Sequence, residues 1–218
     1  MLSWLRAQIY DTLISSIEDD FLKPQRKTLL SQTSGKVLEV GSGTGATIGL
    51  YPTNNNITDL IYVEPDHYMR AKLVSKLQEY KNDPNNKELV TPTIISASLP
   101  SLPYPDNTFD YVVSMLVLCS VPTLKTSIAE LHRILKPGGK LLFIEHVQAK
   151  EGSFQYKMQS WFWWPWFLFF DGCDVKRKTR QIIEEVFGGG NVKGKEFDFG
   201  CREHWLACSW SCGEAVKT

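Results

Sequence analysis

The sequence predicts an α/β fold, with a mostly parallel seven-stranded sheet that carries helices on both faces. Two observations predict it. Short apolar runs alternate with segments of helical periodicity as far as His146, the pattern that repeated strand–helix units produce. The 218 residues are 43% hydrophobic, enough for a full core, and we assign residues 1–218 to one domain. Because Lys plus Arg equals Asp plus Glu at 24 each, no nucleic-acid partner is expected.

The elements follow one another in a regular order. The expected strands are Val37–Val40, Asp59–Val63, Thr93–Ala97, Asp110–Leu116 and Lys140–His146, and the expected helices are Ala46–Tyr51, His67–Tyr80, Leu124–Leu135 and Thr179–Phe187. Pro52 shortens the first helix, and Lys136-Pro-Gly-Gly139 ends the third. Two weaker strand-like stretches, around Phe197 and Trp205, complete the sheet as a closing hairpin. Ligands of such sheets bind at the carboxyl ends of the strands.

Two segments depart from this alternation. Apolar residues recur at helical spacing near the N-terminus, at Leu2, Leu5, Ile9, Leu13, Ile17 and Phe21. Within residues 1–30 we therefore expect an amphipathic helix that packs on the domain, acts as a lid, or lies on a membrane surface. The second segment is the aromatic run Trp161–Phe170, inside an insertion at residues 150–180. It is too short to span a bilayer, which takes ~20 apolar residues. We expect it to line an apolar pocket or face a membrane rather than fill the core.

The cysteines indicate the compartment. There are five, at positions 119, 173, 201, 208 and 212. An odd number without a secretory signal favours a reducing environment, so we expect a cytoplasmic protein, either free or peripheral on an intracellular membrane. Cys208-x-x-x-Cys212 could supply half of a zinc site, but no second Cys/His pair with suitable spacing follows. No metal site is therefore predicted.

The run Val37-Leu-Glu-Val-Gly-Ser-Gly-Thr-Gly45 is the most informative in the chain. Glycines at 41, 43 and 45 let the backbone turn sharply and approach a ligand closely. A strand that leads into such a turn is typical of nucleotide-type sites. The spacing is G-x-G-x-G rather than G-x-G-x-x-G, and Glu39 precedes the turn. This combination resembles motif I of the class I S-adenosylmethionine (SAM) methyltransferases, which have a Rossmann-like fold. A different Rossmann-type nucleotide site is the alternative.

The resemblance implies a set of cofactor contacts at the first two strands. Gly41, Ser42, Gly43 and Gly45 would approach the carboxypropyl and ribose parts of SAM. Glu39 would face the ammonium group, directly or through water. Glu64 ends the second strand, just over twenty residues beyond the first glycine, and would accept hydrogen bonds from the ribose hydroxyls, with Pro65 beside it.

Two later loops would complete the cofactor site. After the third strand, many related enzymes have an Asp where Ala97 stands, and that acid contacts the adenine amino group. Here Ser98 or backbone groups would take its place, at a cost of ~1 kcal/mol for the lost hydrogen bond. After the fourth strand, Met115 and Leu116 would border the methionine part of SAM, where the acceptor arrives.

A narrower resemblance rests on five motifs. They are Leu38-Glu-Val-Gly-x-Gly-Thr-Gly-Ala46, Leu116-Val-Leu-Cys-Ser-Val121, Leu135-Lys-Pro-Gly-Gly139, Glu145-His-Val147 and Phe170-Asp-Gly-Cys173. In this order they are similar to those of the methyltransferase-like 7 group, the thiol S-methyltransferases. The resemblance implies SAM-dependent methylation of small or lipophilic thiols. Animal members begin with a hydrophobic anchoring segment, in contrast to the amphipathic N-terminal pattern of this chain.

The acceptor side leaves several hypotheses open. A thiol attacks as thiolate, with an unperturbed pKa of ~8.5, so a base would help. His146, at the end of the fifth strand, and Asp171, after the aromatic run, are the candidates, and either could instead be structural. A lipid or quinone methyltransferase is the alternative enzyme, because such enzymes share the glycine turn and Lys-Pro-Gly-Gly. A catalytically silent SAM-fold assembly subunit is the alternative outside enzymes.

Overall fold

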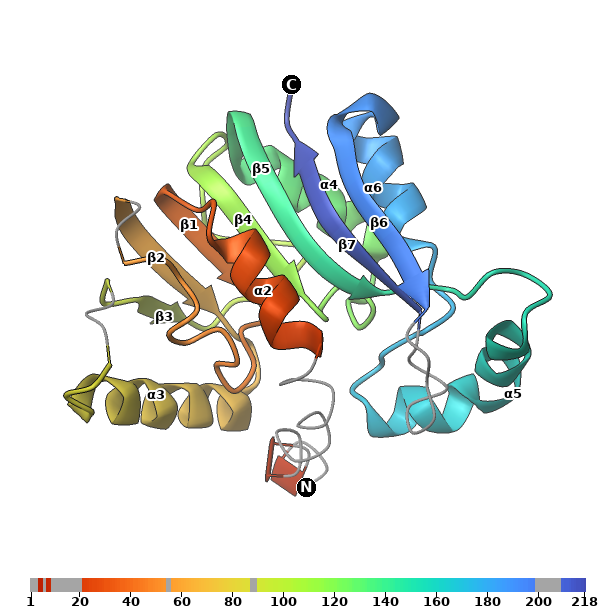
Figure 1. Cartoon of the computed structure of the whole chain (residues 1–218), viewed down its shortest axis with the longest axis horizontal. Coiled ribbons are helices and arrows are strands. Elements are labelled where there is room, and N and C mark those ends of the chain that lie inside the picture. Colours follow the sequence, from red (N-terminus) through yellow and green to blue (C-terminus); the bar gives the residue numbers. More distant parts are fainter. Residues whose placement is uncertain (1–3, 6, 9–20, 54–55, 87–89, 199–208) are drawn as a thin grey trace.

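The computed structural model describes residues 4–5, 7–8, 21–53, 56–86, 90–198 and 209–218. The strands are β1 (Gly35–Val40), β2 (Ile57–Val63), β3 (Thr93–Ile95), β4 (Phe109–Met115), β5 (Leu135–His146), β6 (Val192–Asp198) and β7 (Ser209–Val216). The helices are α2 (Lys23–Leu30), α3 (His67–Asn82), α4 (Leu124–Ile134), α5 (Phe154–Phe169) and α6 (Thr179–Phe187), with a short 3-10 helix, η2 (Gly189–Asn191). The sheet runs through the middle of the molecule (Figure 1).

The seven strands form one sheet in the order β3-β2-β1-β4-β5-β7-β6. Neighbouring strands are parallel except at β7, which pairs antiparallel with both β5 and β6. The predicted seven-stranded, mostly parallel sheet is therefore confirmed. Parallel strands place their carboxyl ends at one edge of the sheet, which is the lower edge in Figure 1.

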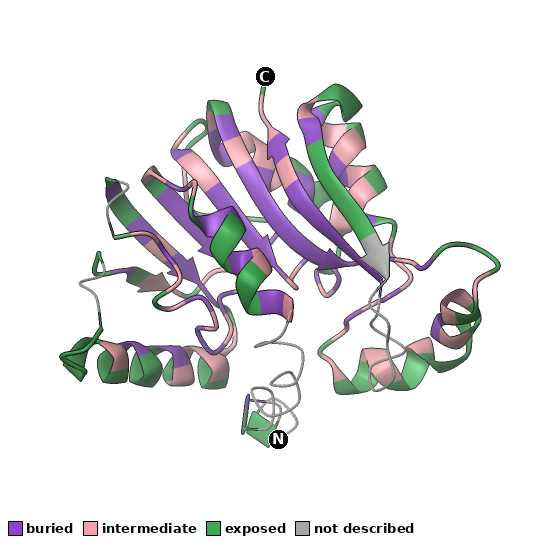
Figure 2. Ribbon diagram, viewed as in Figure 1, coloured by how far each residue is buried: buried purple, intermediate pink, exposed green. Residues whose placement is uncertain are grey.

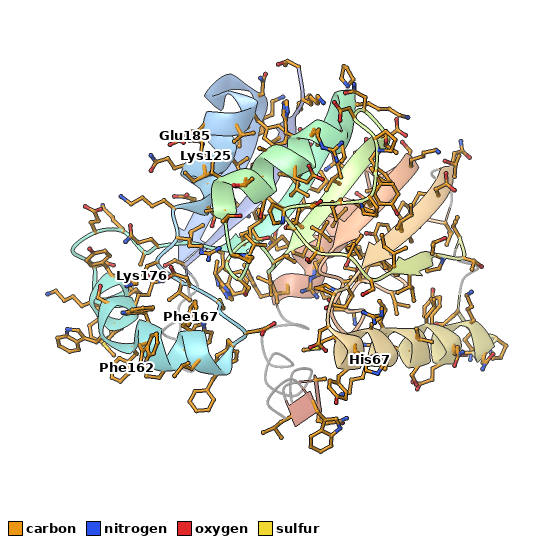
Figure 3. The ribbon with its side chains drawn as sticks, turned by 180° about the vertical axis from the view of Figure 1, so that it is seen from behind. His67, Lys125, Phe162, Phe167, Lys176 and Glu185 are labelled. Atoms are coloured by element: carbon orange, nitrogen blue, oxygen red, sulfur yellow. The ribbon has the colours of Figure 1, made fainter. Side chains whose placement is uncertain are left out.

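Alternate residues of the central strands face opposite helix layers, because successive side chains of a strand point to opposite sides. Leu38 and Phe143 belong to the core shared with α4 and α6, and Val37 belongs to the core shared with α2 and α3. Helices α4 and α6 lie side by side, and an ion pair of 3.1 Å between Lys125 and Glu185 joins them (Figure 3). Helices on both faces were also predicted, and the structure confirms them.

One prediction about local structure was wrong. Ala46–Tyr51 is a series of turns rather than a helix, because Gly45 and Gly49 have φ of +85° and +79°, which an α-helix excludes. The closing hairpin is confirmed as β6 and β7, whereas the stretch expected around Trp205 lies outside the described residues. Cys212 is buried within β7 and forms part of the core.

Helix α5 carries most of the aromatic run and stands at the side of the molecule (Figure 2). Ser153 caps it by accepting a hydrogen bond from the Tyr156 amide. Trp161 and Phe169 are 73% and 70% exposed, and Gln159 is its buried residue. The run is therefore not a simple core element, as predicted. Among the described residues, no helix has the length and apolar character needed to cross a bilayer.

The N-terminal amphipathic helix expected within residues 1–30 falls mostly outside the described residues. The described part of that range ends in α2, whose Leu29 and Leu30 are buried against the sheet.

Candidate functional site

The glycine turn after β1 has the backbone geometry that its sequence predicts. Gly41, Gly43 and Gly45 have φ of +57°, +56° and +85°, a region that side chains disfavour. A Cβ at Gly41 would lie 2.5 Å from the side chain of Val117, so this glycine lets the turn press against the loop after β4. A Cβ at Gly43 would meet nothing closer than 3.9 Å. The face of Gly43 is therefore open to a ligand.

Glu39 lies beneath this turn and is 3% exposed. Its carboxylate accepts hydrogen bonds from the Tyr51 hydroxyl at 2.6 Å and from the Thr47 hydroxyl at 2.8 and 3.0 Å. Burial raises the pKa of Glu39 to about 7, against the opposing effect of these hydroxyls and of the Arg26 charge. The contacts explain the turns at 46–51, because the carboxylate draws both hydroxyls under the glycines.

Glu64 directly follows β2 and lies beside the glycine turn. One carboxylate oxygen accepts from the Gly43 amide and the other from the Asp66 amide, both at 2.8 Å. Burial raises the pKa of Glu64; those two amides oppose the rise, and the negative charges of Asp66 and Asp171 add to it. The spacing predicted that an acid would lie next to the turn, and the structure brings the two together. Additional lone pairs of this carboxylate can accept further donors.

The loop after β3 lies next to Glu64, since the Glu64 amide donates to the Ile95 carbonyl at 3.1 Å. Ala97 is half-buried against the core, and Ser98 is exposed and bridges to Ser101. Pro65 is exposed, and its carbonyl accepts a hydrogen bond from Arg70 at 3.1 Å. These residues lie at the same edge as the glycine turn.

The end of β4 carries backbone strain. Leu116 has φ of +66°, which costs a non-glycine residue ~1–2 kcal/mol, and its amide donates to the Ile144 carbonyl at 2.8 Å. Met115 before it is buried and Leu116 is partly buried, both in the α2-side core. Strain of this kind clusters at functional sites because the surrounding structure has to hold it.

Glu145, for which the sequence suggested no role, holds the loop after β4. It is fully buried and accepts hydrogen bonds from the Ser114 hydroxyl at 2.8 Å, the Val117 amide at 3.2 Å and the Leu118 amide at 3.0 Å. Burial raises its pKa, and these donors oppose the rise. The sequence signal was its place in Glu145-His-Val147. Its partners lie 27 to 31 residues away, so no local pattern could identify them.

The two candidate bases do not converge. Nδ1 of His146 lies 3.5 Å from Sγ of Cys173, and its ring contacts Trp210 with centroids 4.2 Å apart. Cys119 joins this group, and the contact with Cys173 together with burial raises the pKa of the Cys119 thiol well above its usual value. Asp171 is instead exposed with φ of +54°, and its charge acts on Glu64.

Comparison with known proteins identifies relatives over most of the chain. A family described as "Methyltransferase domain" matches residues 38–143. The thiol S-methyltransferase TMT1B of Homo sapiens is 34% identical over 159 residues, which are 72% of this chain and 62% of that protein. TMT1B of Mus musculus is 33% identical, over 76% of this chain and 68% of that protein. A phosphatidylethanolamine N-methyltransferase of Cereibacter sphaeroides is 30% identical, over 69% of each. The match thus spans less than two thirds of the human relative's own length.

Solved structures share the fold. One is a SAM-dependent methyltransferase of Thermotoga maritima, described as a possible histamine N-methyltransferase, with a TM-score of 0.65, 14% identity and full coverage of both chains. Another is phosphoethanolamine N-methyltransferase 2 of Haemonchus contortus in complex with SAM, with a TM-score of 0.62, 16% identity, and coverage of 89% of this chain and 52% of that one. At these identities the likeness concerns the fold alone.

Proposed function

The chain belongs to the class I SAM-dependent methyltransferases, and on that premise we propose that its methyl acceptor is a small or lipophilic thiol. The main support for a thiol acceptor is the similarity to thiol S-methyltransferases, at 33–34% identity over 70–76% of this chain. The methyltransferase family match, over residues 38–143, includes the carboxyl ends of β1, β2, β3 and β4.

The residues at this edge fit the cofactor. The open face of Gly43 leaves room for close approach of a ligand, and Glu64 offers a buried carboxylate for paired hydroxyl donors. We propose that Gly41–Gly45 and Glu64 hold the carboxypropyl and ribose parts, and that Ala97 and Ser98 border the adenine. When bound, SAM supplies a methyl group already activated by its sulfonium charge, so the protein mainly has to align the acceptor.

Glu39 has a supporting role in this proposal. Its carboxylate is 3% exposed and already accepts from Thr47 and Tyr51, which favours holding the turn over direct contact with the ammonium group. A water-mediated contact with that group stays compatible with the geometry.

On the acceptor side, we propose that Met115 and Leu116 border the reacting atoms and that His146 helps to bring the acceptor to its thiolate form. His146 lies at the end of β5, close to Cys119 in the loop after β4. We propose Asp171, which is exposed just after α5, as the second candidate base. The exposed aromatic face of α5 would contact a lipophilic acceptor, or the surface of an intracellular membrane that dissolves it.

A phospholipid acceptor is the second candidate, favoured by the relative that is named a phosphatidylethanolamine N-methyltransferase. The experiment is calorimetric titration with SAM, followed by methyl transfer to an alkyl thiol, a quinol and phosphatidylethanolamine. We expect SAM binding and methylation of the thiol. Transfer to the lipid or quinol alone would reverse the order of the acceptors. SAM binding without transfer to any of them would favour the silent-subunit alternative.

A further inference from the structure

Three side chains from distant parts of the sequence meet at the carboxyl edge of the sheet. Cys119 lies in the loop after β4, His146 ends β5, and Cys173 follows α5. Each belongs to a different motif, namely Leu116-Val-Leu-Cys-Ser-Val121, Glu145-His-Val147 and Phe170-Asp-Gly-Cys173. The proposed cofactor contacts involve none of these three residues. One shared site would give a function to all of them.

The geometry of the three residues matches a metal site. Their ligand atoms, two Sγ and one imidazole nitrogen, all lie within 4.8 Å of one another. Both cysteines are free thiols rather than a disulfide. In a tetrahedral zinc site with Zn–S of about 2.3 Å and Zn–N of about 2.0 Å, a sulfur and a nitrogen ligand are separated by about 3.5 Å. The distance from Cys173 Sγ to His146 Nδ1 is 3.5 Å.

The backbone that carries these ligands is fixed from several sides. The Cys119 carbonyl accepts from the Asp174 amide at 2.9 Å, and the Leu118 carbonyl accepts from Arg177 at 2.7 Å. The Leu118 amide donates to buried Glu145. These contacts tie the segment after α5 to the loop after β4 and so bring the two thiols together without help from a bound ion. Preorganisation of this kind lowers the ordering cost of binding.

We propose that Cys119, His146 and Cys173 bind a thiophilic divalent metal ion, most simply Zn²⁺. Two thiolates and an imidazole are the soft ligands that zinc selects. Buried Val175, with Trp166 and Phe170 packed against the same cluster, provides an apolar wall that strengthens metal–ligand attraction. No fourth Cys, His, Asp or Glu joins the group within the described residues. Three protein ligands and one open position are characteristic of catalytic rather than structural zinc.

The open position would take the acceptor sulfur, a step that rests on the proposed thiol methyltransferase function. On coordination the S–H bond of the acceptor breaks, a metal–sulfur bond forms and the proton passes to water. The acceptor is then a thiolate below its free pKa of ~8.5. In this arrangement His146 is a metal ligand rather than a proton acceptor. Leu116, proposed to border the reacting atoms, and Cys119 lie in the same loop after β4, so the metal site is next to the proposed methyl-transfer region.

The test is metal binding by the purified full chain, kept reduced with a phosphine. We expect about one zinc per chain by mass spectrometry, and in the metal-free protein a Co²⁺ titration should give a thiolate-to-cobalt charge-transfer band. Cys119→Ser and Cys173→Ser should weaken Zn²⁺ binding by about 100-fold or more. Cys212→Ser, which removes another buried cysteine outside the cluster, should bind as the wild type does.

A folded wild-type chain that binds neither Zn²⁺ nor Co²⁺ overturns the inference, as does equal loss of binding in Cys212→Ser. If the serine variants fail to fold, the Co²⁺ spectrum of the wild type still decides. Adding an alkyl thiol should intensify the charge-transfer band, and an unchanged band would reject the open position. Metal content is measured without SAM or acceptor. If a metal-free chain methylates thiols, the metal site is rejected and the proposed thiol methyltransferase function stands. If the chain binds zinc but methylates no thiol, the proposed function is rejected and the metal site stands.

Discussion

Substitution of Gly43 by alanine tests where the cofactor lies. The new Cβ would meet no protein atom within 3.9 Å, so it would project into the space assigned to SAM without an internal clash. At φ of +56° the backbone strain costs ~1–2 kcal/mol. For a chain of this size each kcal/mol lowers Tm by ~2–4 °C, so a fall of ~2–8 °C is expected.

The loss of SAM affinity should be larger than the strain explains. An extra methyl group forced into a close contact costs ~1–3 kcal/mol, which corresponds to ~5- to 150-fold in Kd. Gly43→Val, with a larger branched side chain, should abolish binding. Calorimetric titration with SAM gives the Kd, and thermal unfolding gives the stability of each variant.

Gly138→Ala is the matched control. Gly138 has φ of +79°, and a Cβ built on it has no atom within 4 Å. Alanine there should cause similar backbone strain near the amino end of β5, away from the glycine turn. We expect a similar fall in Tm and unchanged SAM affinity. Unchanged affinity in folded Gly43→Ala, or equal loss in both variants, would refute the placement of the cofactor at this turn.

Four further predictions test other parts of the site. Glu64→Ala should weaken SAM binding by ~10- to 150-fold, since a hydrogen bond to a charged group contributes ~1.5–3 kcal/mol; unchanged calorimetric affinity would contradict its ribose role. The pKa of Glu39 is raised from 4.5 to about 7, so between these pH values the folded chain holds a proton that the unfolded chain releases. From pH 4.5 to 7 the free energy of unfolding of the wild type in urea should therefore fall by ~3 kcal/mol relative to that of Glu39→Gln. Parallel pH profiles of the two proteins would contradict the raised pKa. Glu145→Ala should lower the free energy of unfolding by ~3 kcal/mol or more, because three donors lose their acceptor, and Glu145→Gln should lose less; equal stability of both would count against this role. Trp161 is 73% exposed, so Trp161→Ala should change Tm by no more than ~2 °C. In a methyl-transfer assay it should raise KM for lipophilic thiols more than for hydrophilic ones, and equal effects on both would show that α5 does not contact the acceptor.

The positions of the residues proposed to bind the cofactor could be predicted from the sequence because their signals are local. The glycines at 41–45 directly follow a strand, and parallel order places the end of β2, with Glu64, beside them. Here the position of each residue at the sheet edge follows from its distance to a strand end. The helix at 46–51 was wrong for the same local reason, since Gly49 was read as a helix residue although its φ is +79°.

The acceptor half could not be predicted in this way. Cys119 is 1% exposed, and its neighbours Cys173 and His146 come from other segments of the chain. Their meeting depends on how the chain after α5 returns to the sheet, held by the bond between the Asp174 amide and the Cys119 carbonyl. No periodicity or spacing encodes that contact.

Two buried acids couple these halves. Glu39 on β1 holds the chain after the glycine turn through Thr47 and Tyr51, and Glu145 on β5 holds the loop after β4 through backbone amides. Burial, rather than an ion pair, dominates the environment of both carboxyl groups and raises their pKa values. Burying them therefore lowers the stability of the fold, and in return their hydrogen bonds fix the two loops. The loops also touch each other, because Gly41 leaves just enough room for Val117. A shift of the loop after β4 would therefore press on the glycine turn, which would couple the proposed acceptor site to the proposed cofactor site.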